Sequence, residues 1–221
     1  RVRLPAHYNI LHMACETENY DIISDLIASG MDMNEKGRCA VTPAQLLEDK
    51  PIMMYNIPSR CGVSMSPQII ANLFNSFDNI KAIKEASGSI QQTLEIKHLC
   101  DIKVFSGDDS LVLPLMSVGG DGVVSVASNL VPNYINQLVG LFMANQVESA
   151  TKLNKYLFPL FKSLFIDTNP VPLKYLSVKC NLASDDSVRL PLVKIQSQEV
   201  QNELDKMLHI INEKKYSETE A

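Results

Sequence analysis

The sequence has no run of basic residues. Its 20 Lys and Arg residues are outnumbered by 25 Asp and Glu residues, which gives a net charge of −5. A surface that binds a phosphate backbone needs a concentration of positive charge. The composition therefore argues against nucleic acid as a partner.

Paired cysteines and long apolar runs are also missing. The five cysteines are odd in number, scattered and without a C-x-x-C pair: Cys15, Cys39, Cys61, Cys100 and Cys180. This usage is typical of reduced thiols and predicts a cytoplasmic location. Apolar runs are broken at Pro114 and at Gly119-Gly120, well short of the ~18 residues that a membrane-spanning helix needs. Neither a membrane segment nor a signal peptide is predicted.

Lys84 is the candidate nucleophile of the sequence. It ends the apolar run that starts at Ile80, and small residues and Gly88 follow it. In a regular strand Ile80, Ala82 and Lys84 share one face. A lysine on such a face is partly desolvated, which favours the neutral amine and predicts a nucleophile that forms a Schiff base with a carbonyl compound. The alternative is a lysine that reaches water at a strand end.

Residues 1–49 show an internal period that the rest of the chain lacks. Asn9 to His12 matches Thr42 to Gln45 at an offset of 33 residues, the ankyrin spacing. His12 and Ala14 stand at the positions of His and Ala in the ankyrin Thr-Pro-Leu-His-x-Ala signature. The segment therefore resembles about one and a half ankyrin repeats, which implies a surface for a protein partner. An ordinary helical hairpin is the alternative.

From Pro51 the sequence changes to short β runs that alternate with helical segments, which predicts an α/β domain over residues 51–221 with parallel strands. The predicted strands are 52–55, 80–84, 104–106 and 123–126, and the predicted helices are 66–76, 90–100, 110–118, 131–145, 147–165, 171–179 and 199–213. Four βα units amount to half of a TIM (β/α)8 barrel, which typically takes about 250 residues. A doubly wound sheet is the alternative, but no glycine-rich phosphate motif supports it.

Six ordered motifs carry a more specific resemblance. They are Tyr55-Asn56-Ile57-Pro58-Ser59-Arg60-Cys61-Gly62, Lys84-Glu85-Ala86-Ser87-Gly88, Ser106-Gly107-Asp108-Asp109, Gly119-Gly120-Asp121-Gly122-Val123-Val124-Ser125-Val126, Asn169-Pro170-Val171-Pro172-Leu173-Lys174 and Arg189-Leu190-Pro191-Leu192. Together, from about Pro51 to Leu208, they strongly resemble the dihydrodipicolinate synthase family.

The resemblance implies a role for each candidate residue. Lys84 corresponds to the lysine that condenses with pyruvate, and Tyr55 to the tyrosine that relays protons. Arg60 corresponds to the arginine that binds aspartate semialdehyde, which related N-acetylneuraminate lyases do not carry. Gly107 and Val124 match positions whose backbone lines the pyruvate pocket. No metal and no organic cofactor is implied, and the adjacent Asp108 and Asp109 are interpreted as helix caps.

The same resemblance implies that the match begins at the family's fifth strand, so that the chain looks like a fusion or a truncated product. Two functions follow. The chain is either a Schiff-base-forming lyase whose activity needs a homo-oligomer or a complementing chain, or a non-catalytic ankyrin-type interaction protein that carries a barrel remnant.

Overall fold

The computed structural model describes residues 50–212, so the ankyrin-like segment 1–49 lies outside the described residues. The described chain forms two compact units. The first comprises residues 50–107 and 114–123, and the second comprises residues 108–113 and 124–212. No helix in the described range is long and apolar enough to cross a membrane.

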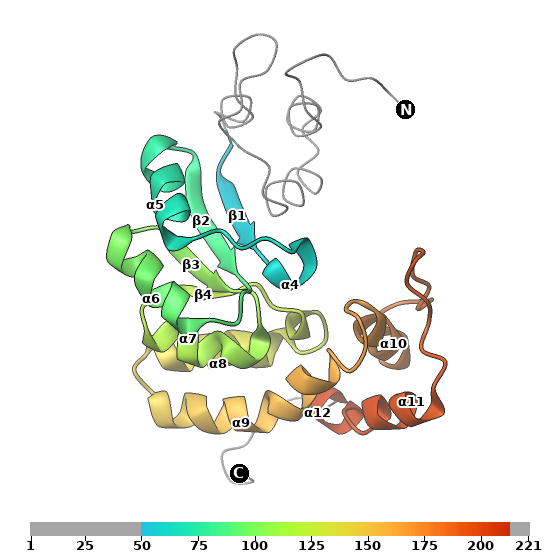
Figure 1. Ribbon diagram of the computed structural model, residues 1–221. Helices are drawn as coiled ribbons and strands as arrows, with labels where there is room; N and C mark the ends of the chain where they lie inside the picture. The colour runs from blue at the N-terminus through green and yellow to red at the C-terminus, as the bar shows by residue number, and fades with distance from the viewer. Residues whose placement is uncertain (1–49, 213–221) are drawn as a thin grey trace, which may run out of the picture. The chain divides into compact units, whose positions relative to one another are not determined.

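The first unit is built on a four-stranded parallel sheet in the order β1-β2-β3-β4 (Figure 1). The strands are β1 (Ile52–Asn56), β2 (Ile80–Glu85), β3 (Lys103–Ser106) and β4 (Gly122–Val123). The predicted α/β class and parallel strands are confirmed. The predicted fourth strand was too long, because the chain leaves the sheet after Val123 and enters a 3₁₀ helix, η2 (Ala127–Asn129).

Helices follow the strands of this unit: α4 (Pro58–Cys61), α5 (Pro67–Ser76), α6 (Ile90–Leu99) and α7 (Val112–Ser117), of which residues 114–117 belong to this unit. The side chains of Ser66 and Ser89 accept hydrogen bonds from backbone amides in the first turns of α5 and α6, at 3.3 and 3.1 Å. These caps satisfy amides that have no partner within the helix. The short helix α4 was not predicted, and it ends at Gly62, whose φ is +72°.

The main core of this unit lies between the sheet and its helices. Its buried residues include Ile52, Met54, Ile80, Ile83 and Val104 from the strands, with Ile70, Ile96 and Leu115 from the helices. The prediction that Ile80 shares the face of Lys84 was wrong. Ile52 pairs with Ile80 and Met53 with Ala82, so Lys81 is an extra residue that reverses the alternation. Ile80 therefore joins Ile83 in the core, whereas Ala82 and Lys84 face the other side.

The second unit is helical. It contains η1 (Asp109–Leu111), η2, α8 (Pro132–Met143), α9 (Val147–Ser163), α10 (Val171–Lys179), α11 (Gln198–Asp205) and α12 (Leu208–Asn212). Leu138 of α8 and Leu153 and Leu157 of α9 are fully buried. The single helix predicted over 199–213 was wrong, because the chain turns at Lys206 and Met207 between α11 and α12. The amide of Met207 bonds to the carbonyl of Leu204, a tighter turn than an α-helix has.

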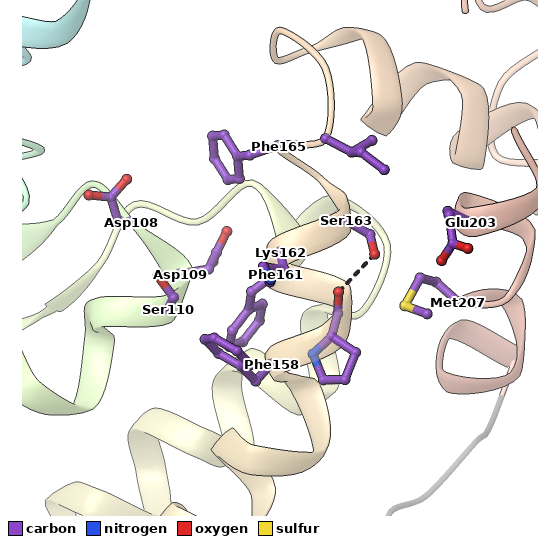
Figure 2. A pocket seen from close by; sticks show the side chains of 12 residues that line it. Asp108, Asp109, Ser110, Phe158, Phe161, Lys162, Ser163, Phe165, Glu203 and Met207 are labelled. Atoms are coloured by element: carbon purple, nitrogen blue, oxygen red, sulfur yellow. Dashed lines mark hydrogen bonds between the residues drawn. The ribbon is translucent and has the colours of Figure 1, made fainter. Parts of the chain in front are cut away.

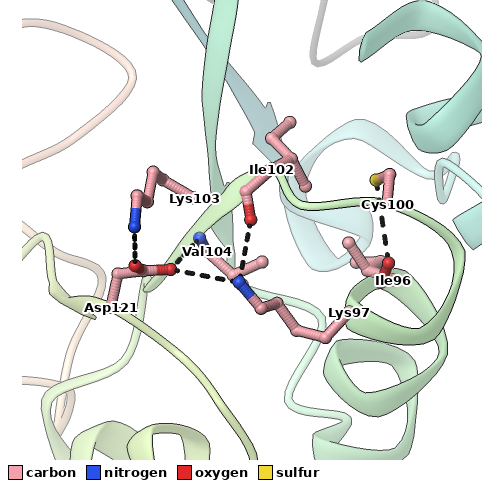
Figure 3. Close-up of polar contacts among 7 residues, drawn as sticks. All are labelled: Ile96, Lys97, Cys100, Ile102, Lys103, Val104 and Asp121. Atoms are coloured by element: carbon pink, nitrogen blue, oxygen red, sulfur yellow. Dashed lines mark hydrogen bonds and ion pairs between the residues drawn. The ribbon is translucent and has the colours of Figure 1, made fainter. Parts of the chain in front are cut away.

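Asp121 joins segments at the amino end of β3 (Figure 3). Its carboxylate accepts hydrogen bonds from Lys103 Nζ at 2.8 Å and from the amide of Val104 at 2.9 Å, and it lies 3.6 Å from Lys97 Nζ. Burial acts to raise the pKa of Asp121, but these donors and the charge of Lys97 outweigh it, so the net pKa lies below its usual value. The ionised carboxylate therefore stabilises the fold.

We expect Asp121→Asn to lower the free energy of unfolding by about 1 kcal/mol at neutral pH, because the charge-assisted bonds weaken. A carboxyl group whose pKa is lowered on folding contributes stability above its unfolded pKa and loses it as the pH falls through the folded pKa. The difference between the variant and the original chain should therefore shrink in acid. Urea unfolding at neutral and acidic pH measures this difference. Asp78→Asn, at an exposed position in the turn before β2, is the control, and a pH-independent difference would contradict the assignment.

Candidate active site

Tyr55 and Lys84 lie side by side at the carboxyl ends of β1 and β2. The two residues are direct partners in the parallel register. Lys84 Nζ lies 4.1 Å from the centroid of the Tyr55 ring, and both side chains are half-buried. The structure thus brings together the amine and the phenol that the sequence predicted to act together.

The face of the sheet that carries this pair lies opposite the core face, which α5, α6 and α7 cover. Lys84 is flanked in the register by Tyr55 on one side and Phe105 on the other. Ala82, two residues before Lys84 on the same face, is 7% exposed. The aliphatic part of the Lys84 side chain therefore has aromatic neighbours. Because Lys81 is an extra residue in the pairing, the Lys84 side chain points to this face and not to the face of Ile80.

A buried polar pair lies immediately after the two candidate residues. Asn56 and Glu85 are 1% and 3% exposed, and Asn56 Nδ2 donates to both carboxylate oxygens of Glu85, at 3.2 and 3.0 Å. Sequence reasoning missed this pair. The available signal was that each residue follows a strand-end candidate and so points to the helix-covered face, where a carboxylate needs donors.

Gly107 brings the end of β3 against the end of β2. Its amide donates to the carbonyl of Glu85 at 2.7 Å. A Cβ atom at this position would overlap Ala86 Cβ, closer than non-bonded carbon atoms can approach, and would make a tight contact of 3.1 Å with Ala86 Cα. Glycine is therefore required by the close approach of two backbones.

The other two predicted residues are placed differently. Arg60 lies in the last turn of α4, which follows β1 directly, and it is exposed. Val124 is half-buried and follows β4, and it belongs to the second unit. Tyr55, Lys84 and Gly107 thus lie at adjoining strand ends of one sheet, whereas Val124 is part of the other unit.

Asp108 and Asp109 of the second unit were both predicted to be helix caps, and this prediction is confirmed for only one of them. Asp109 Oδ2 accepts hydrogen bonds from the amides of Val126 and Ala127, both at 3.0 Å, and so caps η2. Asp108 makes no side-chain capping bond to η1, the helix that it precedes. Within residues 50–212, no group of His, Cys, Asp or Glu side chains could hold a metal ion.

A cavity of about 730 Å³ lies in the second unit (Figure 2). Aromatic and aliphatic side chains of α9 and the following turn form much of its wall, together with polar groups such as Lys162 and Glu203. None of the five predicted site residues lines it. The candidate site is therefore the strand-end pair of the first unit and not this cavity.

A parallel βα sheet with reactive side chains at the carboxyl ends of its strands is the arrangement of the TIM-barrel enzymes. Residues 44–211 match the model of the dihydrodipicolinate synthetase family. The chain therefore belongs to this family of lyases.

Curated relatives and solved structures agree with the match. The chain is 47% identical to the 4-hydroxy-tetrahydrodipicolinate synthase of Heliobacterium modesticaldum over 154 residues, which are 68% of this chain and 50% of that protein. It is 46% identical to the synthase of a Cyanothece species over 68% of this chain and 51% of that protein. The crystal structure of dihydrodipicolinate synthase from Aquifex aeolicus matches with a TM-score of 0.74 at 36% identity, over 78% of this chain and 59% of that chain. The chain thus spans about half the length of these relatives.

Proposed function

We propose that the chain carries the imine-forming half of a 4-hydroxy-tetrahydrodipicolinate synthase, which joins pyruvate to aspartate semialdehyde in lysine (diaminopimelate) biosynthesis. The observation that carries the proposal is the position of Lys84 Nζ, 4.1 Å from the Tyr55 ring at adjacent strand ends. An amine and a phenol so placed can act on one carbonyl group.

In the proposed reaction the neutral amine of Lys84 attacks C2 of pyruvate, and loss of water gives a protonated imine. The imine accepts the electron pair that is left when the methyl group of pyruvate loses a proton. The resulting enamine carbon forms a bond to the aldehyde carbon of aspartate semialdehyde. Attack of that substrate's amine on C2 then closes the ring and releases Lys84. Tyr55 transfers protons to and from the condensing oxygen atoms.

The remaining predicted residues have binding roles in this proposal. The exposed guanidinium of Arg60 pairs with the carboxylate of aspartate semialdehyde, for which its planar donors are suited. Gly107 and Val124 contribute backbone groups to the pyruvate pocket. No cofactor takes part, because the imine itself accepts the electrons. Closing a barrel around Lys84 needs strands beyond the four of the described sheet, and a second copy or a complementing chain can supply them.

We expect borohydride reduction in the presence of pyruvate to label the chain at Lys84 alone, because this lysine combines a strand end with an aromatic, half-buried setting. Peptide mass mapping identifies the labelled residue. Lys84→Arg should abolish the label, since a guanidinium does not form the imine. Lys81→Arg, on the same strand but exposed, should keep it. Labelling at other lysines, or none in folded protein, would contradict the proposed function.

A further inference from the structure

We propose that Glu85 is a positioning residue for the Lys84–Tyr55 pair, and that it acts through Asn56 and Gln92. The inference rests on the proposed function for its chemical meaning. Its geometry is independent of that function, because it concerns only how two strand ends are held together.

The Glu85 carboxylate lies at the centre of a buried hydrogen-bond network. Its Oε1 accepts from the amide of Ser87 at 2.7 Å, and its Oε2 accepts from Gln92 Nε2 at 3.0 Å. Asn56 Nδ2 donates to both oxygens. The backbone of Met65 completes the network, since its amide donates to Asn56 Oδ1 at 3.0 Å and its carbonyl accepts from Gln92 Nε2 at 3.1 Å.

The direction of these bonds requires a carboxylate at residue 85. The amide of Met65 fixes the orientation of the Asn56 side chain, so that Nδ2 must point at Glu85. The carbonyl of Met65 likewise orients Gln92, so that Nε2 points at Glu85. The groups that bond to the Glu85 side chain in this network are thus all donors. A glutamine there would place its own NH₂ group against at least one of them, at a buried position where such a mismatch is costly.

The network joins the segments that hold the candidate residues. Asn56 and Glu85 are register partners one residue beyond Tyr55 and Lys84. Their bond therefore fixes the two strand ends together on the helix side while the amine and the ring meet on the other side. Met65 ends the loop that follows α4, the helix that carries Arg60, and Gln92 lies in the first turn of α6. One buried carboxylate thus sets the relative positions of β1, β2 and the loops that follow them.

A reciprocal exchange tests the network. Glu85→Gln alone places donors against donors, and Asn56→Asp alone places two buried carboxylates about 3 Å apart, where like charges repel. In the double variant N56D/E85Q, the new carboxylate at position 56 accepts from the Met65 amide and from the new NH₂ group at position 85. The side-chain carbonyl at position 85 still accepts from the Ser87 amide, while the Gln92 amide must turn over and give up the Met65 carbonyl. We therefore expect the double variant to recover most of what each single variant loses.

Two measurements are made on the full chain. The first is the position of the Lys84 amine, followed by NMR after reductive ¹³C-methylation. Methyl groups over the Tyr55 ring should resonate upfield of those on other lysines, and Lys84→Arg assigns the signal. The second is the rate of pyruvate trapping by borohydride at Lys84. Each single variant should lose the upfield shift and trap about tenfold to a hundredfold more slowly, and the double variant should regain both.

The possible outcomes separate this inference from the proposed function. Loss and recovery of the upfield shift without any trapping of pyruvate in the original chain would support the positioning role and overturn the proposed function. Single variants that keep the shift and the trapping rate would overturn the positioning role. So would trapping that falls only in proportion to the folded fraction measured by circular dichroism, because Glu85 would then be merely structural.

Discussion

The 221-residue chain is expected to show no steady-state synthase turnover alone, and to gain it when mixed with the first half of a relative's barrel. In the described part of the chain, β1 and β4 each have one hydrogen-bonded neighbour in the sheet, so each presents an unpaired strand edge. Such edges recruit further strands. The face that carries Lys84 also includes Met53, which is 40% exposed. Further parallel strands would pair the edges and cover this face.

Closure of the barrel by further strands is expected to matter for the chemistry as well as for folding. The half-buried amine of Lys84 must be neutral to attack pyruvate, and exclusion of water favours the neutral form of a lysine. A closed barrel also holds the second substrate against the enamine, and such positioning supplies much of an enzyme's rate enhancement. Pyruvate trapping by the chain alone is therefore expected to be slow but detectable, whereas the complete two-substrate reaction needs the complement.

A coupled assay for the condensation product, with light scattering to measure the size of the complex, checks this expectation. The complementing half can be taken from the Heliobacterium modesticaldum synthase, which is 47% identical over the matched region. A mixture containing Lys84→Arg should assemble equally well and remain inactive. A monodisperse monomer of the chain alone with full synthase turnover would contradict the prediction.

Gly107→Ala is expected to lower the free energy of unfolding by about 1–3 kcal/mol, the usual cost of overpacking a tight site. The new Cβ would overlap Ala86 Cβ and lie 3.2 Å from the carbonyl oxygen of Glu85. Neither of these atoms is at the end of a flexible side chain, so the strand ends themselves must separate. That separation would strain the bond from the Gly107 amide to the Glu85 carbonyl. Urea unfolding followed by circular dichroism measures the loss.

Two variants serve as controls for this substitution. The double variant A86G/G107A removes the closest atom and should recover part of the stability, although a glycine at position 86 adds flexibility to the unfolded chain. Gly140→Ala, in the middle of α8 with no heavy atom within 4 Å of the new Cβ, should instead stabilise the chain by about 0.5–1 kcal/mol. Equal effects at positions 107 and 140 would show that close approach is not the reason for Gly107.

Local sequence signals predicted the helices and strands of the first unit well. Ser66 followed by Pro67 marks the start of α5, because the serine caps the helix and proline is suited to its first turn. The α4 segment carries only half of this signal, since Pro58 lies in its first turn but Ile57 makes no side-chain capping bond, and the helix has only four residues. The break between α11 and α12 was missed for a related reason. The sequence there is amphipathic throughout, and neither glycine nor proline marks the turn.

The sequence by itself determined that Lys84 and Tyr55 lie at the ends of neighbouring parallel strands. Small residues and Gly88 follow the apolar run that ends at Lys84, Pro58 follows the run that ends at Tyr55, and βα alternation makes adjacent strands parallel. Only the tertiary structure decided which face Lys84 occupies. Regular alternation places Ile80 and Lys84 on the same face of the sheet. In the pairing with β1, Lys81 is an extra residue, so the two side chains lie on opposite faces. The role of Glu85 also depends on the tertiary structure. Its donors come from positions 56, 87 and 92, and folding alone brings these together around one buried carboxylate.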